Sequence, residues 1–319
     1  MMHRRTRAEV IAGLSAAVAV GALPVRGSAQ TAALRVGLIP IWDVAPYYAA
    51  EQQGYFTAEN LSVGAQVVRG GPVAIPAMAG GTFDLVYSNG VSVVQAIARG
   101  IDLRIVIEGA PLGKSPPDPG ALLKRKGDPF RTGADLEGKV VAVNALRDIQ
   151  WMFVHAWVKA TGGDPDKVQI VELGLPAMLD AVKAKRVDAA LVLDPFLTIG
   201  LGDPQIELLD WPLSKVYPNG ATAFFVTTPE IADRRGADLR AFVRAYKRGV
   251  GWINANEGKD AFVALIADFT KISPDLIRRI KAPPANADVY PNTLPQLSVL
   301  MQQAGLLTGN VDLRTKVFR

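Results

Sequence analysis

Two segments far apart in the chain place polar side chains directly after an apolar run. Ser88 and Asn89 follow a run that ends at Tyr87, and Asp194 follows the run Ala189–Leu193. An apolar run bounded by turns is typical of a strand buried on both faces of a parallel sheet. Polar groups at the carboxyl end of such strands lie where open α/β sheets bind ligands. The repeat therefore predicts two α/β lobes that offer polar groups to a shared cleft.

The candidate ligand-binding residues come from four such strand ends. They are Trp42 and Asp43, Ser88 and Asn89, Asn144, Arg147, Asp148 and Gln150, and Asp194 and Phe196. Arg147 could hold a carboxylate through two parallel hydrogen bonds, and Trp42 could stack on a planar ligand. The structural alternatives are that Arg147 pairs with Asp148 or with an Asp across the cleft, and that Trp42 only covers the core of its lobe.

Ser88, Asn89 and Asp194 each have a second interpretation as helix caps. Ser88 and Asn89 directly precede a predicted helix, and both residue types are favoured at that position. Capping is compatible with ligand binding, because a helix start also offers backbone N–H groups that suit a carboxylate or a phosphate. Asp194 could accept a ligand N–H group or cap the segment that follows it.

Asp84 and Asp188 occupy matching places just before the two repeated runs. They therefore lie at the strand ends opposite the predicted cleft. We expect them to hold turns there by accepting hydrogen bonds from nearby backbone N–H groups, and not to bind ligand.

The elements that must position these groups alternate regularly between strands and helices. The first half of the chain predicts strands at Leu34–Pro40, Leu61–Val68, Phe83–Tyr87 and Leu103–Glu108, with helices at Ala45–Gly54, up to Met78 and at Val91–Arg99. This order predicts parallel strands joined by right-handed crossovers. The Pro-rich segment Lys114–Gly120 then marks a boundary between lobes.

A second α/β unit follows this boundary. Its predicted strands are Lys139–Val143, Val168–Glu172 and Ala189–Leu193, and its predicted helices are Ile149–Ala160 and Ala177–Ala184. We expect Gly220–Thr227 to return the chain to the first lobe, where helices near Leu239–Asn254, Lys259–Asp268, Asp275–Ile280 and Thr293–Ala304 would pack. Lobe I would then comprise residues 30–118 and 225–319, and lobe II residues 119–224, joined by two crossovers that suit a hinge.

The composition is that of a globular chain of roughly two domains, with 319 residues, 49% of them hydrophobic and 20% charged. The net charge of +5 does not indicate nucleic-acid binding, because no Lys/Arg stripe with interleaved aromatic residues is present. Much of this charge comes from Arg4, Arg5 and Arg7 at the start of the chain.

These arginines begin a predicted export signal. The apolar run Val10–Leu23 follows them, and the small residues up to Ala29 offer a cleavage site. The alternative is a membrane anchor, but the run is shorter than the ~20 apolar residues that span a bilayer. We therefore expect residues 1–29 to be a cleaved signal, exported by either the Sec or the twin-arginine route.

Cysteine is absent from the chain, which excludes disulfides, a Cys nucleophile, thiolate metal sites and a lipidated N-terminal Cys. The mature protein should therefore be free in the periplasm. His155 stands in an aromatic helix beside Trp151, Phe153 and Trp157, where a lone His is expected to pack. The sequence contains no His triad, HExxH or Walker motif. We accordingly expect no metal, no cofactor and no enzymatic activity.

Several local patterns together resemble a known family. They are Leu34–Pro40, Tyr47–Phe56, Asp135–Val143, Pro176–Val182, Val187–Ala190 and Asp194–Phe196. Their order and spacing resemble the nitrate/sulfonate/taurine-type solute-binding proteins of ABC importers, over nearly all of the chain after the signal. The resemblance implies a type II-like periplasmic binding fold of two lobes, each a mostly parallel sheet flanked by helices. It also implies a monomer that clamps a small molecule and presents it to an inner-membrane permease.

The chain departs from this family at Leu146. Sulfonate and nitrate binders often have small residues here, and Leu cannot give the same close backbone approach to an anion. The favoured ligand is therefore another small organic anion, such as an aromatic carboxylate bound by Arg147 and Trp42. The alternative is a neutral or cationic heterocycle held by Asp43, Asp148 and Asp194.

Two other classes of function remain open. The protein could sense a ligand for a membrane receptor. It could also be an enzyme, since some relatives of this fold make the thiamine pyrimidine. The resemblance to those enzymes would require a Cys-rich segment and an active-site His. This chain lacks both features.

Overall fold

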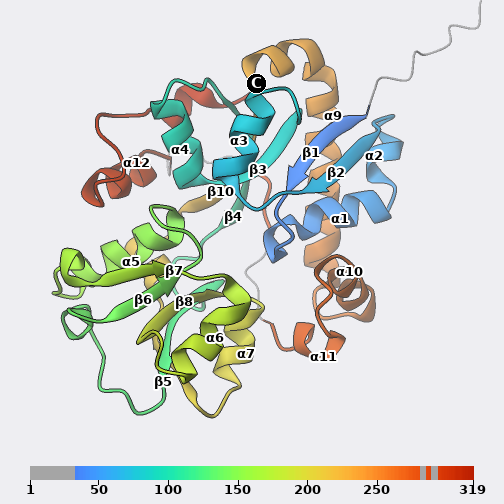
Figure 1. Ribbon diagram of the computed structural model, residues 1–319. Coiled ribbons are helices and arrows are strands. Elements are labelled where there is room, and N and C mark those ends of the chain that lie inside the picture. The colour runs from blue at the N-terminus through green and yellow to red at the C-terminus, as the bar shows by residue number, and fades with distance from the viewer. Residues whose placement is uncertain (1–32, 281–284, 289–293) are drawn as a thin grey trace, which may run out of the picture. The chain divides into compact units, whose positions relative to one another are not determined.

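The computed structural model describes residues 33–280, 285–288 and 294–319, which form two five-stranded sheets flanked by helices (Figure 1). The predicted export signal lies outside these residues, as does Thr293 at the start of the last predicted helix. None of the helices within them is long and apolar enough to cross a bilayer.

Sheet A has the strand order β2-β1-β3-β10-β4. Its strands are β1 (Leu34–Leu38), β2 (Val63–Val67), β3 (Leu85–Asn89), β4 (Arg104–Pro111) and β10 (Ala221–Thr227). β1 pairs in parallel with β2 and β3, whereas β10 runs antiparallel to its neighbours β3 and β4. The other four strands therefore share one direction, and β10 lies between β3 and β4 in this sheet.

Sheet B repeats this arrangement with the order β7-β6-β8-β5-β9. Its strands are β5 (Gly120–Arg125), β6 (Val140–Val143), β7 (Gln169–Glu172), β8 (Ala189–Leu193) and β9 (Ile206–Asp210). Here β5 is the antiparallel strand, since it pairs antiparallel with both β8 and β9. Each sheet thus consists mostly of parallel strands, as predicted.

Strands β5 and β9 were not predicted from the sequence. Lys124 is a charged residue within β5, where a buried strand is normally apolar, yet its side chain is buried. The Lys124 amine donates to the carbonyl oxygens of Asp128 and Phe130 at 2.6 and 2.7 Å and pairs with Glu207 in β9 at 3.0 Å. These contacts satisfy the charge, so that β5 can occupy the interior of the sheet.

The helices of the first and last parts of the chain accompany sheet A. They are α1 (Ala45–Gln52), α2 (Tyr55–Ala58), α3 (Gly71–Ala79), α4 (Gly90–Ala98), α9 (Pro229–Asn256), α10 (Asp260–Thr270), α11 (Pro274–Ile277) and α12 (Leu294–Gln303), with 3-10 turns at Trp42–Val44 and Leu313–Lys316. Pro lies in the first turn of α1, α3 and α9, where its missing N–H is tolerated. Thr228 and Ser273 cap α9 and α11 through their side chains.

The middle of the chain supplies the helices around sheet B. These are α5 (Ile149–Ala160), α6 (Leu175–Lys183), α7 (Phe196–Leu201) and α8 (Pro212–Val216), with 3-10 turns at Ala134–Leu136 and Pro165–Lys167. The bounds of α5 are those expected from the sequence.

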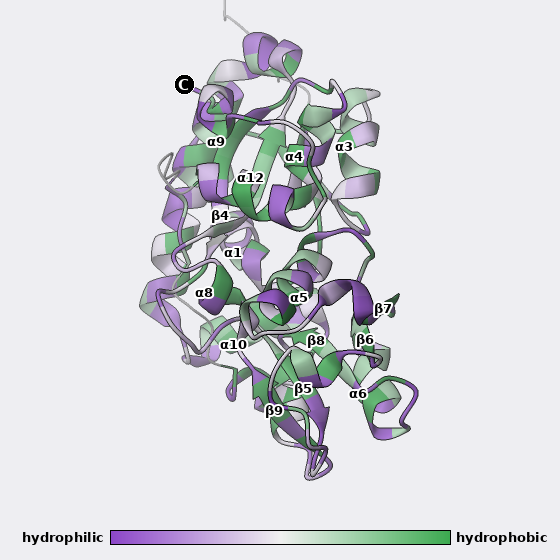
Figure 2. Ribbon diagram, turned by 90° about the vertical axis from the view of Figure 1, so that its left-hand side faces the viewer, coloured by the Kyte–Doolittle hydropathy of each residue, from purple (hydrophilic) through white to green (hydrophobic). Residues whose placement is uncertain are grey.

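The central strands β1, β3 and β10 of sheet A are buried on both faces, whereas the edge strand β2 is mostly exposed. Neighbouring residues of β10 point to opposite faces: Phe225 packs with Phe242 and Tyr246 of α9, and Phe224 belongs to the cluster that includes Val94 of α4. The strand seen behind α12 is correspondingly hydrophobic (Figure 2). This two-sided burial explains why these strands have apolar runs and not alternating patterns.

Asp84 and Asp188 have equivalent roles in the two sheets. The Asp84 carboxylate accepts the backbone N–H of Arg35 at 2.9 Å, and the Asp188 carboxylate accepts that of Val140 at 2.8 Å. Each Asp therefore holds the start of the neighbouring strand, β1 or β6. The predicted structural role with backbone donors is present, but the donors lie on the adjacent strand and not in a local turn.

Candidate ligand-binding site

Asn89 combines a helix cap with a contact to the segment that follows β6. Its side-chain oxygen accepts the N–H of Ser92 at 3.0 Å, so the capping interpretation is correct for Asn89 and wrong for Ser88. Its Nδ2 group donates to Oδ2 of Asp148 at 3.1 Å, and the Ser92 hydroxyl donates to Oδ1 of the same carboxylate at 3.2 Å. The carboxyl end of β3 and the start of α5 are thus joined by polar side chains.

Asp148 is the buried centre of this group, with 7% of the residue exposed. Burial raises the pKa of its carboxyl group, and the hydrogen bonds from Ser92 and Asn89 partly oppose this shift. A group of this kind can exchange its internal donors for those of a ligand.

Arg147 lies beside Asp148 but does not pair with it. Its backbone has a positive φ of 55°. The guanidinium donates one hydrogen bond to the carbonyl of Gly305, at 3.0 Å, and lies 5.8 Å from the ring of Trp151. Within the described residues it forms no ion pair, so its other N–H groups can still bind a carboxylate.

Gln150 and Asn144 close the loop between β6 and α5. The backbone N–H of Asn144 donates to Oε1 of Gln150 at 2.7 Å, which fixes the orientation of the Gln150 amide. The Nε2 group of Gln150 is then buried without a hydrogen-bond partner among the residues that the structure describes. An unsatisfied buried donor is costly and therefore marks a place where a ligand acceptor can bind.

Asp43 is held by two tyrosine hydroxyl groups. Tyr87 donates to its carboxylate at 3.2 Å, and Tyr246 donates to its backbone carbonyl at 3.4 Å. Burial raises the pKa of Asp43 to about 6, although the hydrogen bond from Tyr87 lowers it. Trp42 packs edge-on against Phe262 of α10, with ring centroids 5.3 Å apart. Its ring therefore covers part of the core and is only partly exposed.

Ser88 lies inside the packing between α3 and α4. The residue is fully buried, and its hydroxyl donates to the carbonyl of Asn89 at 3.3 Å. A Cβ atom on Gly71 would lie only 2.0 Å from this hydroxyl. The start of α3 can approach β3 this closely only because residue 71 is a glycine.

Asp194 holds the first turn of α7 from the residue before the N-cap, which is Pro195. Its carboxylate accepts the backbone N–H and the hydroxyl of Thr198 at 3.0 and 2.6 Å. Burial raises its pKa, and the bonds from Thr198 oppose the shift. Phe196 is partly buried and packs against the cluster around Met178. No hydrogen bond within the described ranges connects Asp194 or Phe196 with the Asn89–Asp148 group.

The sequence did not predict three residues that hold candidate site residues: Ser92, which binds Asp148, and Tyr87 and Tyr246, which bind Asp43. Ser92 occupies the third position of the helix that Asn89 caps, so its place could have been found from the capping pattern. Tyr87 and Tyr246 could not. Tyr87 belongs to an apolar run and Tyr246 lies among charged residues of α9, and each meets Asp43 only through the tertiary fold.

His155 is packed, as expected. Its ring stacks on Trp151 with centroids 4.8 Å apart, and burial lowers its pKa. In the part of the chain that the structure describes, no group of three or more His, Asp or Glu residues could hold a metal ion.

Comparison with known proteins supports the fold and the family. The sequence model of the NMT1/THI5-like family matches residues 42–258. No curated protein matches the chain. Among solved structures, the periplasmic aliphatic sulphonate-binding protein SsuA of Escherichia coli superposes with a TM-score of 0.74 at 19% identity, covering 90% of this chain and 97% of that one.

Two further structures have the same fold. The alkanesulfonate-binding protein SsuA of Xanthomonas axonopodis pv. citri, bound to MOPS, gives a TM-score of 0.74 at 20% identity and covers 92% of this chain and 100% of its own. The periplasmic nitrate-binding protein NrtA of Synechocystis PCC 6803 gives 0.72 at 13% identity, with 89% and 84% covered. The predicted resemblance is thereby confirmed: the chain has the fold of the periplasmic solute-binding proteins and belongs to the NMT1/THI5-like family.

Proposed function

We propose that this protein is the periplasmic solute-binding component of an ABC importer. It captures a small organic ligand in a cleft between its two lobes and delivers it to an inner-membrane permease. The observation that carries the proposal is the polar group formed by Asn89, Ser92 and Asp148, which links the carboxyl end of a sheet A strand to the first helix after β6. The binding proteins with the same fold support this role.

Lobe I in this proposal contains sheet A and lobe II contains sheet B. The crossovers lie after β4 and before β10. All of β10, from Ala221, pairs within sheet A, so the boundary expected between residues 224 and 225 falls inside this strand. We therefore place the second crossover before Ala221. The protein acts as a monomer that is exported and cleaved near Ala29.

The favoured ligand is a small organic anion, such as an aromatic carboxylate. Arg147 retains unbonded guanidinium N–H groups within the described residues, and Gln150, three residues further along the chain, offers its buried Nε2 group as a second donor. The buried Nε2 group requires an acceptor, whereas the exposed Arg147 guanidinium is also hydrated by water. Trp42 supplies an aromatic surface on the lobe I side.

A neutral or cationic heterocycle is the second candidate. Burial raises the pKa values of Asp43, Asp148 and Asp194, so each carboxyl group lacks strong stabilisation by a cation. Donor groups on a ligand could replace Asn89 and Ser92 at Asp148.

A thermal-shift screen of organic anions, neutral heterocycles and amines tests the role and the ligand class together. A bound ligand at about 100 times its Kd should stabilise the fold by about 2.7 kcal/mol. For an anion, Arg147→Ala should weaken binding at least about tenfold, whereas Arg186→Ala, at an exposed position in lobe II, should not. A screen without any stabilising compound would contradict the binding role.

The two other functions need separate experiments. Growth of a deletion strain on the identified ligand separates transport from sensing. The strain should fail to grow if the protein is needed for uptake, and should grow if the protein only senses the ligand. Turnover of the ligand by the purified protein, lost in His155→Ala, would support an enzyme instead.

A further inference from the structure

A basic pocket lies at the end of sheet A that is opposite the candidate ligand-binding site. The pocket has a volume of about 680 Å³, within the usual range for small-molecule sites. It is formed by the start of β4, the first turns of α9 and the last residues of the chain. The charged side chains that line it are Arg104, Arg234, Arg240, Arg314, Arg319 and Asp233.

The strand register separates this pocket from the candidate ligand-binding site. Asn89 of β3 and Gly109 of β4 both pair with Ala223 of β10, so they lie at the same level of the sheet. Arg104 is five residues before Gly109 on β4, which corresponds to roughly 17 Å. The two sites therefore do not share residues.

Only some of the arginines are engaged by carboxylates of the protein. Arg104 pairs with Asp102 at 2.8 Å, and Arg314 pairs with Asp312 at 2.8 Å. Arg234, Arg240 and Arg319 form no ion pair within the described residues, and all of them are exposed. Asp233 is the one acidic side chain of the lining, so the pocket carries an excess of positive charge.

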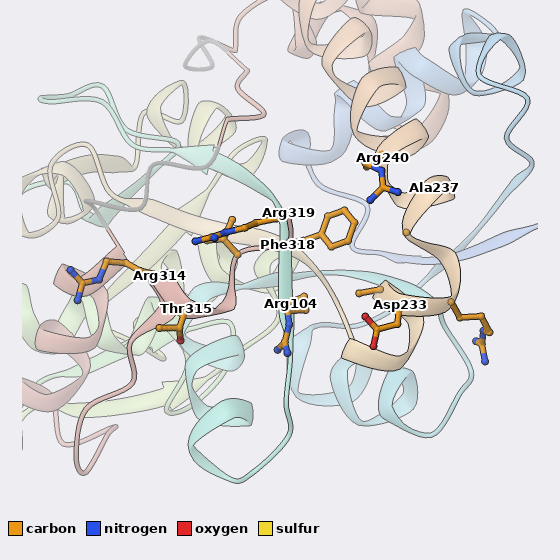
Figure 3. A pocket seen from close by; sticks show the side chains of 12 residues that line it. Arg104, Asp233, Ala237, Arg240, Arg314, Thr315, Phe318 and Arg319 are labelled. Atoms are coloured by element: carbon orange, nitrogen blue, oxygen red, sulfur yellow. The ribbon is translucent and has the colours of Figure 1, made fainter.

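The last residues of the chain are fixed at the pocket. The N–H of Phe318 donates to the carbonyl of Ile105 at 2.8 Å, and Val317 forms a parallel bridge with Ile105. Figure 3 shows Phe318 between Arg319 and Arg240, with Arg104 and Asp233 below them in this view. The pocket thus combines an apolar wall with guanidinium groups from separate elements.

We propose that this pocket binds a multiply charged anion of the phosphate type. Guanidinium groups form paired, charge-assisted hydrogen bonds with phosphate oxygens, and several arginines on separate elements match an anion with more than one charge. The phosphate group can belong to a free small molecule or to a lipid headgroup.

Calorimetric titration of the mature protein with pyrophosphate at constant ionic strength tests the proposal. Saturable binding is expected, and the double variant Arg240→Ala/Arg319→Ala should weaken it at least about tenfold. The exposed Arg186→Ala, far from the pocket in sequence, is the matched control and should change the affinity less than about twofold. Asp233→Ala should tighten binding, because it removes the opposing charge.

A second arm identifies the source of the phosphate group. Co-sedimentation with vesicles that contain cardiolipin, whose headgroup has two phosphate groups, compared with vesicles of phosphatidylcholine, reports on a lipid headgroup. Binding of pyrophosphate or of the anionic vesicles that is lost in the double variant supports the proposal and distinguishes the two sources. The proposal is overturned if neither probe binds, or if the double variant and Arg186→Ala bind the probes equally well. These binding measurements give the same result whether or not the protein binds an organic ligand or takes part in transport.

Discussion

Asp148, at the start of the first helix after β6, accepts a hydrogen bond at 3.1 Å from Asn89, which ends β3 of sheet A. Ser92 adds a second bond to the same carboxylate at 3.2 Å. Asn89 and Ser92 both lie at the start of α4, and both bind the buried carboxyl group of Asp148. The stability of the fold and the candidate site therefore depend on the same residue.

Replacing this carboxyl group should destabilise the protein. Asp148→Ala leaves the Nδ2 group of Asn89 and the hydroxyl of Ser92 without their acceptor, at a cost of about 1–3 kcal/mol in the free energy of unfolding. Urea unfolding measures this change. Asp166→Ala is the control, because that side chain is 92% exposed, and should stay within about 0.5 kcal/mol of the wild type. Equal effects of both variants would contradict a role for Asp148 in stability.

The raised pKa of Asp43 predicts a specific dependence of stability on pH. Its carboxyl group titrates near 3.8 when unfolded and at about 6 in the fold, so the folded state holds the proton more tightly. The resulting stabilisation is complete below about pH 4 and is lost as pH rises through about 6, amounting to at most about 3 kcal/mol.

Urea unfolding of the wild type and of Asp43→Asn from about pH 4 to pH 7 isolates this effect, since other titrating groups cancel in the difference. The stability of the wild type relative to the variant should fall over this range. A difference that is constant or that rises with pH would contradict the burial of the Asp43 carboxyl group.

The equivalent residues Asp84 and Asp188 should differ in importance. Asp84 is buried and also pairs with Arg35 and Arg235, at 2.9 and 3.1 Å, whereas Asp188 is half-buried and accepts a hydrogen bond from the backbone N–H of Val140. Asp84→Ala should therefore cost about 3 kcal/mol and Asp188→Ala about 1 kcal/mol in unfolding free energy. Ligand affinity should be unchanged in both folded variants. Weaker binding would instead assign these residues to the site.

Two glycines of α9 provide a matched test of the packing of this helix on α1. A Cβ atom on Gly249 would lie 2.1 Å from the carbonyl oxygen of Pro46, whereas nothing lies within 4 Å of one on Gly251. Gly249→Ala should destabilise the fold by about 1–3 kcal/mol through overpacking. Gly251→Ala should stabilise it by about 0.5–1 kcal/mol through helix propensity. Thermal unfolding distinguishes them, and equal melting temperatures would argue against this close approach.

Local patterns were sufficient for most of the elements. Apolar runs between turn residues located β8 and β10, and periodic apolar residues gave the bounds of α5. The same reasoning missed β5, because the burial of Lys124 depends on carbonyls and a carboxylate supplied by later segments. A local pattern contains no information about such partners.

The candidate site likewise has some features that local patterns indicate and others that depend on residues distant in the chain. The sequence alone predicted the family, the strand-and-helix order apart from elements such as β5 and β9, and a possible helix cap at Asn89, since each depends on residue types at short spacing. Only the tertiary structure decided that Asn89 and Ser92 meet Asp148, that Arg147 contacts Gly305 and not its neighbour, and that Asp43 meets Tyr87 and Tyr246. The reason is physical: these contacts join residues far apart in the chain, and their geometry is set by how sheets and helices pack.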